Sequence, residues 1–148
     1  MAGLGIIALT GHAADEREGE PMLDPQTGEG FDAPAPPIAY WGAPELMRES
    51  ADLLEVSTRL TAEQGSGAPL DAGVEREYLL RRAALADRLA IEFPDEVYLS
   101  DAVRLSWELG QFDQRHPHFV AGPHGPMSIE FDPSRRPYVR QEYSAWNE

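Results

Sequence analysis

Residues 71–92, DAGVEREYLLRRAALADRLAIE, are the stretch that decides the fold. Apolar side chains recur there every three or four residues with small alanines between them, a pattern typical of a helix buried along one face. Asp71 stands where a side chain can cap the helix, and Pro94 follows where the helix must end. The pattern predicts a helix over residues 72–92 that another helix can approach closely.

Two further segments with helical periodicity flank this stretch, one over residues 44–64 and one over residues 100–115. Their apolar faces are formed by Leu46, Leu53 and Leu60 in the first segment, and by Ala102, Leu105, Leu109 and Phe112 in the second. The Gly-rich link at residues 65–70 is short, so the first two helices should run antiparallel. The sequence therefore predicts a mainly α fold with a three-helix bundle-like core.

The chain changes character after the third helix. Within residues 119–131, apolar and polar side chains alternate in the order Met127, Ser128, Ile129, Glu130 and Phe131. This alternation predicts two extended pieces that pair as a hairpin at the edge of the fold. Helical spacing returns at the C-terminus and predicts a short helix over residues 137–146. We expect residues 44–148 to form a single helical domain.

Residues 1–43 have a different composition from the rest of the chain. The first 44 positions hold 7 glycines and 6 prolines, and acidic residues outnumber the only arginine, Arg17. Such a segment buries little apolar surface on folding, so we expect a disordered acidic arm. Its apolar run at residues 4–9 is shorter than the roughly 20 residues of a membrane span and follows no basic residues. Tyr40 and Trp41 are placed to anchor the arm to the helical domain.

The charge of the chain limits its partners. Among 148 residues there are 26 Asp and Glu against 12 basic residues, all of them Arg, for a formal net charge of −14. Nucleic acids and anionic membranes are bound through basic patches, so we expect neither as a direct partner. The absence of cysteine excludes disulfides, thiolate nucleophiles and all-Cys metal sites. A cytoplasmic location is the default expectation.

One cluster has the composition of a metal site. Three of the four histidines, His116, His118 and His124, fall within nine residues, and Asp113 precedes them. Pro117 favours an extended backbone in which alternate side chains face the same way, and a turn could return the third histidine. Imidazoles with one carboxylate suit zinc or a similar divalent metal. The alternative interpretation is a helix end and a loop that use histidine as a polar residue, with no cofactor.

The C-terminal segment is the second candidate site. It combines arginines with aromatic residues, namely Arg135, Arg136, Tyr138, Arg140, Tyr143 and Trp146. Arg, Tyr and Trp are enriched at the energetic centres of protein interfaces, which favours a surface for a protein partner. In the alternative interpretation, Tyr143 and Trp146 pack onto the helical core, and the arginines pair with its acidic residues.

These features favour a small acidic accessory or adaptor protein that acts through protein–protein interaction, rather than an enzyme. The first alternative is a metal-binding protein or metal-dependent hydrolase that uses the histidine cluster. The second alternative is an acidic mimic of nucleic acid that acts as an inhibitor through its N-terminal arm.

Overall fold

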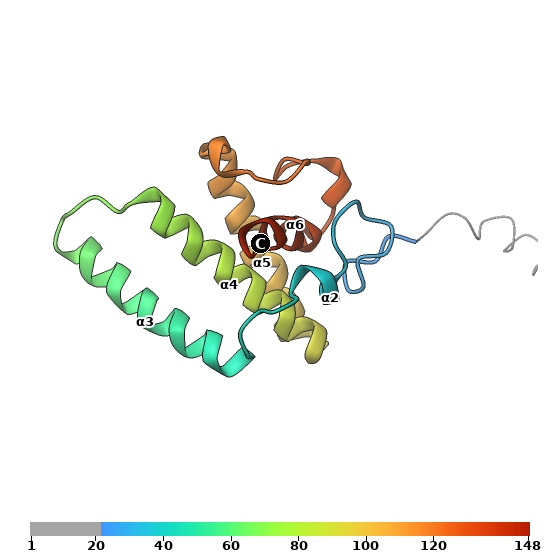
Figure 1. Ribbon diagram of the computed structural model, residues 1–148, viewed down its shortest axis with the longest axis horizontal. Helices are drawn as coiled ribbons and strands as arrows, with labels where there is room; N and C mark the ends of the chain where they lie inside the picture. The colour runs from blue at the N-terminus through green and yellow to red at the C-terminus, as the bar shows by residue number, and fades with distance from the viewer. Residues whose placement is uncertain (1–21) are drawn as a thin grey trace, which may run out of the picture.

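The computed structural model describes residues 22–148, which form a helical protein (Figure 1). Its helices are α2 (Pro36–Ala39), α3 (Leu46–Gly65), α4 (Ala72–Glu92), α5 (Glu96–Arg115) and α6 (Arg136–Trp146), with two short 3-10 turns, η1 (Pro117–Phe119) and η2 (Ile129–Phe131). The described part of the chain contains no β-strand. The prediction of a mainly α fold is confirmed.

Helix α4 is the element on which most of the others pack, and it spans the residues predicted for it. The Asp71 carboxylate caps it by accepting hydrogen bonds from the backbone N–H of Gly73 and Val74, at 2.8 and 3.1 Å. Its innermost apolar side chains are at most 1% exposed, namely Leu80, Ala83, Ala84 and Ala90. Small alanines allow a neighbouring helix to approach closely, and α5 makes the most extensive contact with α4.

Helix α5 begins four residues before its predicted start. The Asp95 carboxylate caps it, accepting hydrogen bonds from the N–H groups of Val97 and Tyr98 at 3.0 and 3.1 Å. Ser100, at the predicted start, lies inside the helix. Asp and Ser are both good caps, and in the structure the helix begins at the aspartate, which directly follows Pro94.

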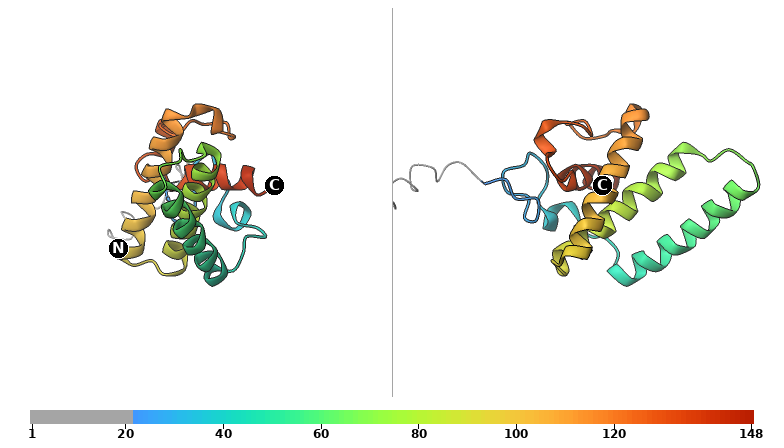
Figure 2. Two further views of the ribbon diagram at one scale, coloured as in Figure 1. Left: turned by 90° about the vertical axis from the view of Figure 1, so that its left-hand side faces the viewer. Right: turned by 180° about the vertical axis from the view of Figure 1, so that it is seen from behind.

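The third helix of the core is α6 rather than α3. α6 lies across α4 and α5 (Figure 1) and contacts both, and its Tyr138, Val139 and Tyr143 are at most 1% exposed. α3 packs extensively only on α4 and projects with it from the rest of the molecule (Figure 2). Bundle-like packing is therefore present, but its centre is the group α4, α5 and α6.

The predicted hairpin within residues 119–131 is wrong, because residues 120–128 form a loop that joins η1 to η2. The backbone of this loop forms hydrogen bonds with α6 instead of pairing as two strands. The Glu142 carboxylate accepts hydrogen bonds from the N–H groups of Ala121 and Gly122, both at 2.8 Å. A Cβ atom at Gly122 would lie 2.2 Å from side-chain atoms of Gln141, so this approach requires glycine.

The alternating residues of the predicted strand have another explanation. In η2, Phe131 is fully buried in the core while Ile129, two positions earlier, is 80% exposed. Side chains on the same face of a strand would share one environment. The alternation therefore reflects a short turn that inserts one aromatic ring into the core.

The N-terminal arm differs from the expectation over the part that the structure describes. Residues 22–43 pack against the helical core, with Phe31 8% and Ala39 1% exposed, and they include the short helix α2. The predicted disorder of residues 1–21 lies outside the described residues. Within residues 22–148, no helix has the length and apolar character needed to cross a membrane.

Candidate partner-binding surface

Two arginines of the predicted partner-binding segment are buried against one carboxylate. Asp87 of α4 is 0% exposed. It accepts hydrogen bonds from Arg136 Nε at 2.6 Å and from Arg140 Nε and Nη2 at 2.8 and 3.0 Å. The phenol of Tyr40 donates a further hydrogen bond to Asp87 at 2.5 Å. A single side chain of α4 thus holds α6 and the segment that follows α2.

A second buried cluster joins α4, α5 and α6 on the other side. Arg76 binds Asp113 through two hydrogen bonds of 3.1 and 2.7 Å and reaches Glu142 at 2.8 Å. Tyr138 donates to Asp113 at 2.6 Å. Asp113, Glu142 and Tyr138 are each 0% exposed, so this cluster belongs to the core.

The two clusters together contain three arginines and three carboxylates, so their formal charges cancel inside the protein. Burial raises the pKa of both Tyr40 and Tyr138, and the carboxylates of Asp87 and Asp113 raise it further. Burial alone would lower the pKa of Arg76, but its hydrogen bonds and ion pairs with the two carboxylates outweigh this effect and raise it. All three side chains therefore keep their protons at neutral pH.

The residues predicted for partner binding are thus mostly inside the molecule. Five of the six are at most 5% exposed, namely Arg135, Arg136, Tyr138, Arg140 and Tyr143. Only Trp146, which is 41% exposed, reaches the surface. The packing corresponds to the alternative interpretation, in which the arginines pair with acidic residues of the core.

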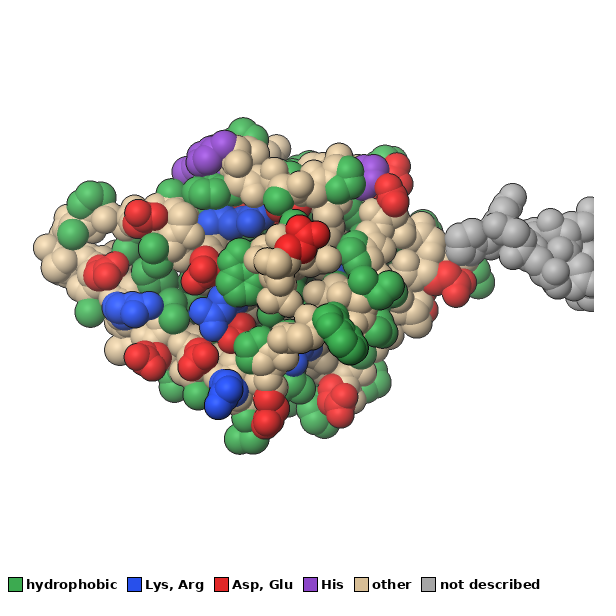
Figure 3. All heavy atoms as spheres, viewed as in Figure 1, with side chains coloured by type: hydrophobic (Ala, Val, Ile, Leu, Met, Phe, Trp, Pro, Cys, Tyr) green, Lys and Arg blue, Asp and Glu red, His purple; other side chains and the backbone are tan. Residues whose placement is uncertain are grey.

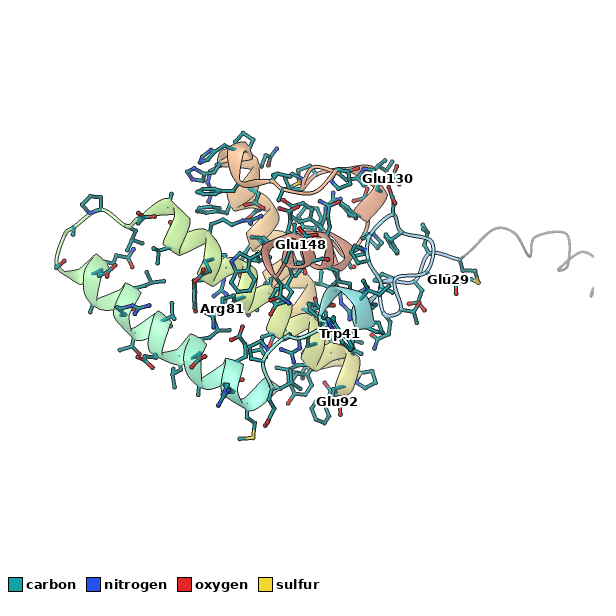
Figure 4. The ribbon with its side chains drawn as sticks, viewed as in Figure 1. Glu29, Trp41, Arg81, Glu92, Glu130 and Glu148 are labelled. Atoms are coloured by element: carbon teal, nitrogen blue, oxygen red, sulfur yellow. The ribbon has the colours of Figure 1, made fainter. Side chains whose placement is uncertain are left out.

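The most exposed large aromatic side chain of the described residues lies elsewhere, at Trp41, which is 83% exposed (Figure 4). Its backbone is held by contacts with the C-terminal segment, although its ring is exposed to solvent. Asn147 donates a hydrogen bond from Nδ2 to the Trp41 carbonyl at 3.0 Å. The preceding Tyr40 packs edge to face on Tyr143, with ring centroids 5.2 Å apart. Trp41 is therefore presented to solvent from a rigid base.

A hollow of about 290 Å³ lies beneath the segment that carries Trp41. It is lined by Pro36, Pro37, Tyr40, Leu46, Arg88, Ile91 and Glu92. Arg88 is held in place by a hydrogen bond of 2.7 Å to the carbonyl of Pro44. Most of the lining is apolar, so the hollow suits an apolar side chain better than a charged one.

The two segments joined by the hydrogen bond from Asn147 to Trp41 carry two further exposed apolar residues, and acidic side chains lie on the same face of the molecule (Figure 3). Ile38, three residues earlier, is 67% exposed, and Trp146 is next to the Asn147 that binds Trp41. We call Ile38, Trp41 and Trp146, with the hollow, the Trp41 surface. Figure 4 shows Glu92 and Glu148 on either side of Trp41, and Figure 3 shows further acidic side chains on this face.

His116 and His118 lie close together, but each packs on an aromatic ring. The His116 ring lies 4.4 Å from that of Phe112, and the His118 ring lies 4.2 Å from that of Phe119, centroid to centroid. The two imidazole rings are 6.2 Å apart and nearly perpendicular. This arrangement is a small aromatic cluster at the end of α5.

The other two residues predicted for the metal site point elsewhere. His124 pairs through Nε2 with Asp32, at 2.6 Å, and Asp113 is occupied by Arg76 and Tyr138. Among residues 22–148, no group of three or more His, Asp or Glu side chains is arranged to hold a metal ion. The described geometry does not bring the four predicted ligands together.

The sequence contains only a partial signal for the Trp41 surface. An aromatic pair that follows a proline-rich segment predicts an anchor, and Tyr40 is one. Adjacent residues of an irregular segment point in different directions, so Trp41 faces solvent. That outcome depends on packing with α6, which local sequence does not encode.

Comparison with known proteins adds no identity to this surface. No family model matches the sequence, and neither the curated proteins nor the solved structures include a significant match.

Proposed function

We propose that the protein is a non-catalytic accessory or adaptor protein that binds a protein partner through the Trp41 surface. The observation that carries the proposal is the 83% exposure of Trp41 on a backbone that Asn147 and Tyr40 hold in place. A fixed backbone lowers the conformational entropy lost when a partner binds. Tryptophan is the residue most enriched at the energetic centres of interfaces.

The surface also defines the chemistry of the partner. The hollow accepts an apolar side chain, and the exposed ring of Trp41 offers further apolar area to the same partner. The acidic residues around the surface favour lysine or arginine on both sides of that apolar anchor. The partner we propose is therefore a protein segment with an apolar anchor between basic residues. We also propose that the protein acts in the cytoplasm.

Photo-cross-linking tests the proposal in cells of the native host. A photoreactive phenylalanine analogue replaces Trp41 in one variant and Ile129 in a matched control. Ile129 is also apolar and 80% exposed, but it lies on η2. We expect a partner that cross-links from position 41 and not from position 129.

Binding of the purified partner then provides the quantitative test. Trp41→Ala should weaken binding at least about 10-fold, as expected for a residue at an energetic centre, while Ile129→Ala should leave the affinity unchanged. A partner that binds both variants equally, or cross-linking that is the same from both positions, would refute the proposal.

A further inference from the structure

Helix α3 has two exposed sides of opposite character. One side carries only uncharged residues: Met47, Ser50, Ala51, Leu54, Thr58 and Thr61. Met47 is 78% and Leu54 71% exposed. The other exposed side carries Arg48, Asp52, Glu55, Arg59 and Glu63, and Figure 3 shows charged side chains along α3. The face of a surface helix that points away from the core normally carries charged or polar residues, so the large exposed side chains of Met47 and Leu54 require an explanation.

The uncharged side continues into a hollow between α3 and α4. This hollow, of about 190 Å³, is lined in part by Ser57 and Thr61 of α3, and by Leu70 and Leu79. On the opposite side of the same seam, Glu49 and Arg81 close the two helices with hydrogen bonds of 3.1 and 2.6 Å. The hollow, which polar and apolar side chains line alike, shares Thr61 with the uncharged face of α3, so the two form one continuous surface.

We propose that this surface is where a second copy of the chain docks, with the two α3 helices antiparallel. Placing the two-fold axis between positions 52 and 53 sets Met47 opposite Thr58 of the second copy. It also sets Leu54 opposite Ala51 of the second copy. Each large side chain then meets a small one, and the two-fold axis repeats each contact. This match in size is what ridges-into-grooves packing of two helices requires.

Charge complementarity supports the same register. Arg48 and Glu55 are both exposed and form no ion pair within residues 22–148. In the antiparallel pair, Arg48 comes within two residues, about 3 Å along the axis, of the level of Glu55 in the second copy. Two Arg48–Glu55 pairs then flank the apolar contact on the same side of the interface. A contact between two single helices is small beside the standard interface of about 1,600 Å², so we expect affinity in the micromolar range.

Cysteine cross-linking tests the register, because the chain contains no cysteine. Two single variants, Met47→Cys and Thr58→Cys, are oxidised alone and as a mixture. In the proposed dimer, identical positions are 11 residues, or about 16 Å, apart along the axis, and a disulfide needs Cα atoms within about 7 Å. We expect cross-linked dimer from the mixture and little from either variant alone. Equal cross-linking of the single variants would overturn the antiparallel register.

Sedimentation equilibrium tests the surface in the intact chain without cross-links. Leu54→Glu should weaken dimerisation at least about 30-fold, whereas Val97→Glu should have no effect. Val97 is a matched control, since it is also apolar, helical and 69% exposed, but on α5. A chain that is monomeric at about 300 µM, or a dimer that Leu54→Glu leaves unchanged, would overturn the proposal.

Charge reversal distinguishes this pairing from general apolar association. Arg48→Glu and Glu55→Arg should each weaken the dimer by about 3- to 10-fold, because each brings like charges together. The double variant Arg48→Glu/Glu55→Arg should restore the affinity to within about 2-fold, since both pairs form again with reversed sign. Failure of this rescue would overturn the register. The test does not involve Trp41, so its outcome is independent of the proposed partner surface.

Discussion

At the scale of single residues, Asp87 determines how α6 is held. Its carboxylate binds two arginines of α6 and the phenol of Tyr40, and no part of its side chain is exposed. Buried ion pairs contribute little net free energy compared with a well-packed apolar core, but removing one partner leaves an unpaired charge and is costly. Here, removing Asp87 would leave two buried guanidinium groups without their counter-charge.

We predict that Asp87→Asn lowers the free energy of unfolding by about 3–5 kcal/mol. The measurement is urea unfolding at pH 7, followed by circular dichroism. Asp101→Asn is the matched control, because Asp101 pairs with Arg104 at 3.4 Å but both side chains are more than half exposed. Exposed pairs are worth less than about 1 kcal/mol. Similar losses in the two variants would contradict the role assigned to Asp87.

Two buried tyrosines of α6 differ in the partners of their hydroxyl groups. The Tyr138 hydroxyl binds Asp113, whereas the Tyr143 hydroxyl is buried without a hydrogen-bond partner among residues 22–148. We predict that Tyr138→Phe costs about 1–3 kcal/mol, because Asp113 loses a donor. Tyr143→Phe should be neutral or stabilising by about 1 kcal/mol, because it removes an unsatisfied polar group. Urea unfolding of both variants checks the difference, and a larger loss for Tyr143→Phe would refute it.

The raised pKa of Tyr138 also predicts how the free energy of unfolding changes at alkaline pH. Its pKa in the folded protein is raised by burial and by Asp113, while in the unfolded chain the phenol titrates near pH 10. Below pH 10 both states hold the proton and stability does not change. Above pH 10 the unfolded state releases it first, so stability falls by about 1.4 kcal/mol per pH unit from this residue.

The measurement for this pH dependence is urea unfolding between pH 9 and 11.5. The slope above pH 10 should be shallower in Tyr138→Phe than in the wild-type chain by about 1.4 kcal/mol per pH unit. Identical slopes would mean that Tyr138 ionises equally easily in both states.

At the scale of elements, the helices could be predicted because their signals are local. Asp71 as a cap and Pro94 as a stop are sufficient to define α4, and the bounds of α3 lie within two residues of the predicted range. The position of α6 in the core could not be predicted, because arginine is a surface residue unless distant residues neutralise it. Its partners on α4, Asp87 and Arg76 among them, are recognisable only when the helices are assembled.

The structure places the residues of the two predicted sites differently for the same physical reason. The histidine spacing predicts proximity along the chain, but His124 pairs with Asp32, a residue 92 positions away. The arginines and tyrosines of α6 have the composition of a protein interface because they form the contact between α6 and the rest of the core. The sequence predicts Trp41 only as an anchor, since its exposure depends on how the segment after α2 meets the C-terminus.

Helix α3 should be the least protected of the long helices. It packs extensively only on α4 and buries just Glu49, Leu53 and Leu60. Elements with few buried contacts open locally at a lower free energy than the whole protein. We predict that hydrogen–deuterium exchange at about 1 µM protein reaches completion in α3 before α4, α5 or α6. Equal protection of all four helices would contradict this.

At the scale of the whole molecule, the net charge lies outside the buried clusters. Four arginines are paired in the interior and at the α3–α4 seam with four carboxylates, namely Arg76, Arg81, Arg136 and Arg140 with Glu49, Asp87, Asp113 and Glu142. Subtracting them from 12 and 26 leaves 8 arginines and 22 acids elsewhere in the chain, so the whole charge of −14 remains. The pairs hold the fold together without reducing the repulsion at its surface.

This separation predicts that salt stabilises the protein. Exposed charges are screened at a Debye length of about 10 Å in 0.1 M salt, while buried pairs are screened much less. Raising sodium chloride from about 0.02 to 0.3 M should therefore increase the free energy of unfolding by about 1 kcal/mol, because repulsion weakens and the buried pairs persist. Urea unfolding at about 1 µM protein keeps the measurement below the expected dimerisation range. The variant Glu63→Gln/Glu130→Gln, which carries two fewer exposed acids, should respond less to salt, and a decrease of stability with salt would show that exposed ion pairs outweigh the repulsion.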